Sequence, residues 1–133
     1  MTSNQSPYKS KGGLGRLVNA LRYSAQGLGA AFRHEAAFRQ ELLLVAVLAP
    51  VAIWLGRSLG EVLMLLGTLF FVLIVELLNS GLEALADTIT LDSHPLIGRA
   101  KDLGSAAVML SIVFGTLVWL AVIASHFLAT QAA

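Results

Sequence analysis

The stretch LGSAAVMLSIVFGTLVWLAVIASHF, residues 103–127, contains no Asp, Glu, Lys or Arg, and His126 near its end is its only ionisable side chain. As an α-helix it is longer than the roughly 30 Å hydrocarbon layer of a membrane. The whole chain is 56% hydrophobic and 13% charged, with a mean hydropathy of +0.76. It is therefore too apolar for an ordinary soluble domain, and residues 103–127 predict a transmembrane helix.

Two further apolar runs precede this one. Residues 62–75 continue through a polar segment to about residue 89, and residues 42–56 reach across a membrane if the turn before them is included. We predict an all-α membrane protein with transmembrane helices at about 36–56, 61–89 and 95–128. The first run starts too far into the chain to be a removable signal peptide.

An amphipathic helix is expected before the first span, at about 14–33. Its apolar residues recur at three- and four-residue spacing: Leu14, Leu17, Val18, Leu21, Ala25, Leu28 and Phe32. Such a helix lies on a membrane surface with its basic face toward anions. Residues 1–13 are predicted to be a disordered tail, and residues 14–133 a single membrane domain.

The basic residues set the orientation. With three crossings, all nine Lys and Arg residues except Arg57 fall on the side that holds the amino terminus and the 90–102 loop. By the positive-inside rule this side is cytoplasmic, and the carboxyl terminus is periplasmic.

A polar stretch, ELLNSGLE at residues 76–83, interrupts the second span. Glu76, Ser80, Glu83 and Asp87 fall on one helical stripe with Asn79 at its flank. Carboxylates inside a membrane helix are costly and mark functional sites. The stripe is therefore the candidate site, although Asp87 is interpreted as a solvated charge at the helix end.

Other polar residues lie at the depth of this stripe. In the following loop, Ser93 is a plausible N-cap before Pro95, and Arg99, Lys101 and Asp102 begin the third span. Glu35, at the start of the first span, either pairs with Arg39 or shares a divalent cation with a carboxylate at the cytoplasmic end of another helix. The sequence has no cysteine, Walker motif or kinase glycine loop. The residues alone thus predict a polar site at the cytoplasmic face, suited to phosphate chemistry.

Three blocks together carry a family resemblance: EAAFRQE (35–41), ELLNSGLE (76–83) and GRAKDLGSAAV (98–108). In order and spacing they resemble the prokaryotic diacylglycerol kinase family, over about residues 16–127. The resemblance implies a homotrimeric helical bundle in the bacterial cytoplasmic (inner) membrane, with active sites between subunits. It implies transfer of the γ-phosphate of ATP to diacylglycerol to give phosphatidic acid, with Mg²⁺ as cofactor and no nucleic-acid partner.

The resemblance also implies residue roles. Glu76 would be the general base, Asn79 would position the reacting groups, and Glu35 and Glu83 would hold Mg²⁺. ATP would be bound by Arg16, Tyr23, Glu35, Glu83, Asp92, Ser93, His94, Lys101 and Asp102. The lipid would be placed by Arg39, Gln40, Glu41, Glu76, Ser105 and Trp119.

Several alternatives stay open. A polyprenol kinase acting on undecaprenol has the same motifs, and an ion-conducting or transport subunit would also carry intramembrane carboxylates. His94 is equally a capping residue, His126 an interface residue, and Trp54 and Trp119 interface or lipid-facing aromatics. The small pairs Ala100/Gly104 and Ser111/Gly115 suit close helix contacts in an oligomer. Asn19, Ala25 and Gln26 depart from the family pattern in the surface helix.

Overall fold

The computed structural model describes residues 13–131, and within this range every regular element is an α-helix. The helices are α1 (Gly13–His34), α2 (Ala36–Leu55), α3 (Leu59–Ile89) and α4 (Pro95–Gln131). The all-α prediction is confirmed, and the predicted bounds agree to within three residues. The predicted tail lies outside the described residues, except for Gly13, which begins α1.

The helices α2, α3 and α4 are long and apolar enough to cross a membrane, which confirms the three predicted spans. They form one compact unit, and α1 belongs to another. On α1 the apolar stripe is exposed, with Leu14 at 82% and Val18 at 63%. This exposure is typical of a helix whose apolar side lies in lipid.

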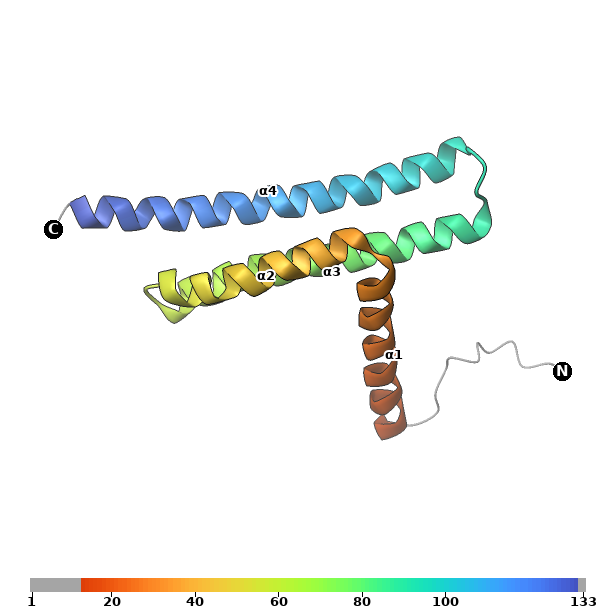
Figure 1. The fold of residues 1–133 in the computed structure, drawn as a ribbon, viewed down its shortest axis with the longest axis horizontal. Helices are drawn as coiled ribbons and strands as arrows, with labels where there is room; N and C mark the ends of the chain where they lie inside the picture. The colour runs from red at the N-terminus through yellow and green to blue at the C-terminus, as the bar shows by residue number, and fades with distance from the viewer. Residues whose placement is uncertain (1–12, 132–133) are drawn as a thin grey trace. The chain divides into compact units, whose positions relative to one another are not determined.

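The central helix of the three-helix unit is α3, which packs against both α2 and α4. Figure 1 shows the three helices running alongside one another, with the α3–α4 loop at one end of the unit. Ala52, Leu65 and Val122, one from each helix, form a buried core, and Trp119 packs against it. Most other large apolar side chains are exposed, as expected where lipid or a second chain covers them.

One buried polar residue of the spans, Thr68, is hydrogen-bonded both within its helix and to another helix. The Thr68 hydroxyl is buried, donates to the Leu65 carbonyl at 2.7 Å and accepts from the Trp119 indole N–H at 3.1 Å. Trp119 is thus held between α3 and α4, where it is partly buried. Trp54, by contrast, is 83% exposed, as expected of an interface residue.

The small residues of α4 also lie at the α3–α4 contact. Ser111 is buried, and a side chain at Gly115 would meet Thr68 at ordinary contact distance. At Gly104 an added Cβ would overlap Asn79 of α3. The close contacts predicted for an oligomer are therefore found within one chain, where small residues let two helices approach.

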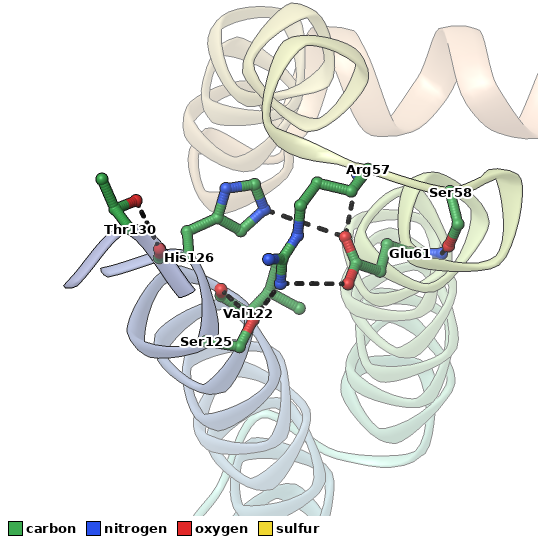
Figure 2. Close-up of polar contacts among 7 residues, drawn as sticks. All are labelled: Arg57, Ser58, Glu61, Val122, Ser125, His126 and Thr130. Carbon is green, nitrogen blue, oxygen red and sulfur yellow. Dashed lines mark hydrogen bonds and ion pairs between the residues drawn. The ribbon is translucent and has the colours of Figure 1, made fainter. Parts of the chain in front are cut away.

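A polar network joins the α2–α3 turn to the end of α4 (Figure 2). The Ser58 hydroxyl caps α3 by accepting the Glu61 N–H at 3.1 Å, while Glu61 accepts the Arg57 N–H at 2.8 Å. The pattern is related to a capping box, but the Glu61 carboxylate binds the N–H of the residue before the cap. The Arg57 guanidinium reaches across to donate to the Ser125 hydroxyl at 2.8 Å, and His126 Nε2 lies 3.8 Å from Glu61. The network therefore joins the α2–α3 turn to α4 at the end of the unit that is remote from residues 76–104.

We expect Arg57→Ala to lower the thermal midpoint by a few degrees, because it removes the link to Ser125 and the partner of Glu61. Arg57→Lys, which keeps the charge, should recover part of the loss. Activity should not change, since Glu61 and Glu76 are separated by about 22 Å of helical rise. Differential scanning fluorimetry in detergent measures the midpoints, and equal values for Arg57→Ala and the unmodified protein would contradict the role of this network.

Candidate active site

Glu76 is the buried member of the predicted stripe, with 4% of its surface exposed. It lies in the middle of α3, and the predominantly apolar residues 62–75 form the turns of this helix that precede it. Glu83 follows two turns later, about 10.5 Å further along the axis, and is half-buried. The deeper carboxyl group is therefore shielded from water, whereas the other is partly accessible.

Asn79 lies between these two positions in the sequence of α3 and binds Glu83. Its amide Nδ2 donates to Glu83 Oε1 at 3.1 Å, across one turn of α3. Its Oδ1 is buried and has no hydrogen-bond partner within the described chain. Asn79 thus orients the Glu83 carboxylate and leaves one acceptor available within the site.

Carboxyl groups of α2 face the same region. Glu35 stands at the N-cap position of α2, where its side chain makes no capping bond, and Glu41 lies further along the helix. The charges of Glu35 and Glu83 act on Glu76, and the charge of Glu76 acts on Glu41. We call Glu35, Glu41, Glu76 and Glu83 the carboxylate cluster. Such a concentration of acid requires cations, protons or polar ligands to balance it.

One cation reaches α3 from α4. Lys101 Nζ donates to Asp87 Oδ1 at 2.6 Å, and its charge also acts on Glu83. Asp87 is about half exposed, yet it has a specific partner and is more than a solvated helix-end charge. The sequence signal for a role at the site was the position of Asp87 on the stripe, one turn after Glu83.

A hollow of about 400 Å³ lies at the α3–α4 loop, next to this ion pair. The structure brings together there four predicted nucleotide-binding residues, namely Asp92, Ser93, His94 and Lys101. Pro95 begins α4 as predicted, but the cap is His94, whose Nδ1 accepts the Leu96 N–H at 3.3 Å. The prediction of Ser93 as N-cap is therefore wrong, and the Ser93 hydroxyl stays exposed in the loop.

A second cavity, of about 270 Å³, lies between the three spans. Its walls are apolar except for Glu41, Thr68, Thr116 and Trp119. Glu41 Oε2 is buried without a hydrogen-bond partner within the described residues. Two predicted lipid-placing residues, Glu41 and Trp119, thus border one apolar space that adjoins the carboxylate cluster.

The other predicted residues are not gathered into these spaces. Arg39 and Gln40 on α2, and Asp102 and Ser105 on α4, are exposed. Arg16 and Tyr23 lie on α1, which is a unit of its own, so their approach to the site stays a prediction.

The carboxylate cluster offers carboxylate oxygens, which are the ligands that a hard divalent cation prefers. Among residues 13–131, no three Asp, Glu, His or Cys side chains lie so that they could together hold a metal ion. Mg²⁺ does not need three such side chains, because one or two carboxylates together with water and substrate phosphates complete its octahedron. Glu35 and Glu83 supply donors of this kind.

The comparison with known proteins decides between the alternatives. Residues 22–123 match the family profile of prokaryotic diacylglycerol kinase. The chain belongs to the prokaryotic diacylglycerol kinase family. It is therefore a membrane lipid kinase, as the three sequence blocks predicted, and a transport subunit is not supported.

Curated members of this family align over nearly their whole length. The diacylglycerol kinase of Pseudomonas aeruginosa is 49% identical over 114 residues, which cover 86% of this chain and 93% of the relative. That of Escherichia coli K12 is 43% identical, covering 86% and 94%, and that of Helicobacter pylori strain 26695 is 38% identical, covering 90% and 92%. The aligned regions are long enough to include the carboxylate cluster, the α3–α4 loop and Lys101.

Proposed function

We propose that the protein transfers the γ-phosphate of ATP directly to the hydroxyl group of diacylglycerol, giving phosphatidic acid and ADP. The observation that carries this proposal is the arrangement along α3. A buried carboxyl group, Glu76, lies two turns deeper than Glu83, which Asn79 orients from between them. A lipid hydroxyl approaches such a site from the membrane and a nucleotide from water.

In the proposed reaction, Glu76 accepts the proton of the lipid hydroxyl as its oxygen attacks the γ-phosphorus. The bond to the bridging oxygen breaks on the opposite side, and ADP leaves. Asn79 holds Glu83 through its Nδ2 and would in this way position the reacting groups. The main contribution of the protein is alignment of the two substrates, which accounts for a large part of phosphoryl-transfer rates.

Mg²⁺ is the proposed cofactor, and when bound it neutralises charge on the ATP phosphates. Glu35 and Glu83 are the residues that would hold it. Lys101 would contribute positive charge to the phosphates, and the hollow bordered by Asp92, Ser93 and His94 would accommodate the nucleotide. Arg16, Tyr23 and Asp102 would complete the nucleotide site.

We expect Lys101→Met to raise the KM for ATP at least about tenfold, because a charged contact to phosphate is lost. Asp87→Asn removes the same ion pair but leaves the Lys101 charge in place. It should therefore have a much smaller effect. Initial rates over a range of ATP concentrations compare the two variants, and equal effects would show that the ion pair matters only for structure.

The apolar cavity between the spans is the proposed place of the lipid chain, with Glu41 and Trp119 at its border. Arg39, Gln40 and Ser105 would contact the lipid closer to the interface. Acyl chains are apolar, and the cavity wall includes Val72, which lies one turn before Glu76 on α3. A lipid lying in the cavity would therefore present its hydroxyl toward the base.

Filling the cavity should act on the lipid alone. We expect Val72→Phe, in the cavity wall, to raise the KM for diacylglycerol about tenfold and to leave the KM for ATP unchanged. Ile74→Phe is the matched control, because Ile74 lies on the same helix and is 53% exposed. Surface-dilution kinetics in mixed micelles measure both constants, and equal effects of the two variants would contradict this use of the cavity.

We further propose a homotrimer with sites shared between subunits, in the inner membrane with the amino terminus cytoplasmic and the carboxyl terminus periplasmic. The distribution of Lys and Arg supports the orientation. The many exposed apolar side chains and the carboxylates gathered at α2 and α3 support an assembly.

Transfer of labelled phosphate from ATP, in mixed micelles with either diacylglycerol or undecaprenol, tests the proposed substrate. We expect product only, or by far faster, with diacylglycerol. Preferential phosphorylation of undecaprenol would replace the proposal with the polyprenol alternative, and no transfer to either lipid would overturn it.

A further inference from the structure

At Gly104, α4 lies close to Asn79 of the site. A Cβ added there would overlap Asn79 Oδ1, and would lie 3.3 Å from Asn79 Cγ and 3.5 Å from Leu82 Cδ2. Among the glycines of α3, Gly67 and Gly81 have nothing within 4 Å of an added Cβ. The contact at Gly104 is therefore specific, since a residue with a side chain would displace the amide of Asn79.

The position of this amide determines how Glu83 is held. A carboxamide is planar, so a displaced Oδ1 carries Nδ2 with it, and Nδ2 donates to Glu83 Oε1 at 3.1 Å. Turning the amide over would place its oxygen against the Glu83 carboxylate and lose the bond. The space at Gly104 thus leaves room for the amide in the position from which Asn79 donates to Glu83.

The surrounding contacts keep the two helices in this register. Lys101, one turn before Gly104 on α4, binds Asp87, one turn after Glu83 on α3. The ion pair and the glycine contact lie one turn apart on α4 and two turns apart on α3, with Glu83 between them on α3. Small shifts between the helices are therefore opposed on both sides of Glu83.

We propose that Gly104 is a positioning residue for phosphoryl transfer. Its lack of a side chain lets Asn79 hold Glu83 in the orientation that binds Mg²⁺. This inference rests on the proposed function of Glu83 as a metal ligand. Gly104 contacts neither substrate in it and acts only through Asn79, as the partners of metal ligands commonly do.

The test compares Gly104→Ala with Gly81→Ala. Both replace a helical glycine and gain the same helix propensity, but only Gly104→Ala meets Asn79. The Mg²⁺ concentration for half-maximal phosphate transfer should rise about tenfold in Gly104→Ala and stay unchanged in Gly81→Ala. An unchanged Mg²⁺ requirement in Gly104→Ala would overturn the proposal.

A second measurement does not depend on activity. Without nucleotide, the thermal midpoint should be lower for Gly104→Ala than for Gly81→Ala, and the difference should vanish when each is combined with Asn79→Ala. If the difference persists without the Asn79 side chain, the contact with Asn79 is not its cause and the proposal fails. If the contact is verified but the unmodified enzyme transfers no phosphate, the proposed function fails instead.

Discussion

Glu76→Gln is expected to lower kcat for phosphate transfer by about three orders of magnitude. The amide is similar in size to the carboxyl group, so packing around this buried position should hold, but it cannot accept the hydroxyl proton. The KM for ATP should change little, because the nucleotide is expected at Glu83 and beyond. Rates with saturating ATP and diacylglycerol in mixed micelles measure the effect.

Glu61→Gln is the matched control, because it makes the same replacement on the same helix at the opposite end of the unit. It should keep its activity while losing some thermal stability. A Glu76→Gln protein that folds and retains the full rate would remove the assignment of Glu76 as the base.

Glu83→Gln is expected to lower kcat/KM for ATP about a hundredfold or more at a fixed Mg²⁺ concentration, because a metal ligand becomes neutral. Raising the Mg²⁺ concentration should restore part of the rate. Glu76→Gln should not respond to Mg²⁺ in this way, so the titration separates the base from the ligand. An identical Mg²⁺ response of Glu83→Gln and the unmodified protein would contradict the metal role.

Oligomers mixed from Glu76→Gln and Glu83→Gln subunits extend this prediction to the assembly. If sites are shared between subunits, some sites draw both intact residues from different chains, and part of the activity returns. Complete inactivity of mixed oligomers would instead show that each chain supplies its own Glu76 and Glu83.

The helices themselves could be predicted from the sequence, because apolar runs of sufficient length and the breaks between them are local properties. The carboxylate stripe was also predictable, since Glu76, Asn79 and Glu83 follow from helical periodicity on one element. The cap at Ser58 could also be predicted, because Ser followed three residues later by Glu is a common motif at the start of a helix. The contacts between this turn and α4 could not be predicted in this way.

Partners on different helices were the part that could not be predicted. In a span, residues facing lipid and residues facing another helix are both apolar, so composition did not show that Trp119 binds Thr68. Asp87 and Lys101 were expected at similar depth, but depth alone does not select a partner. The proposed role of Gly104 depends on the position of Asn79 Oδ1, which cannot be predicted from the sequence of α4.

The hydrogen bond between Trp119 and Thr68 has a practical consequence for optical work on this enzyme. The chain has two tryptophans, and Trp54 is exposed whereas Trp119 borders the intramembrane cavity. With Trp54 replaced by Phe, the intrinsic fluorescence comes from a single indole that lines the cavity, and on the proposed use of the cavity we expect its emission to shift when lipid is added. The emission spectrum then reports lipid entry directly, without a label and without turnover.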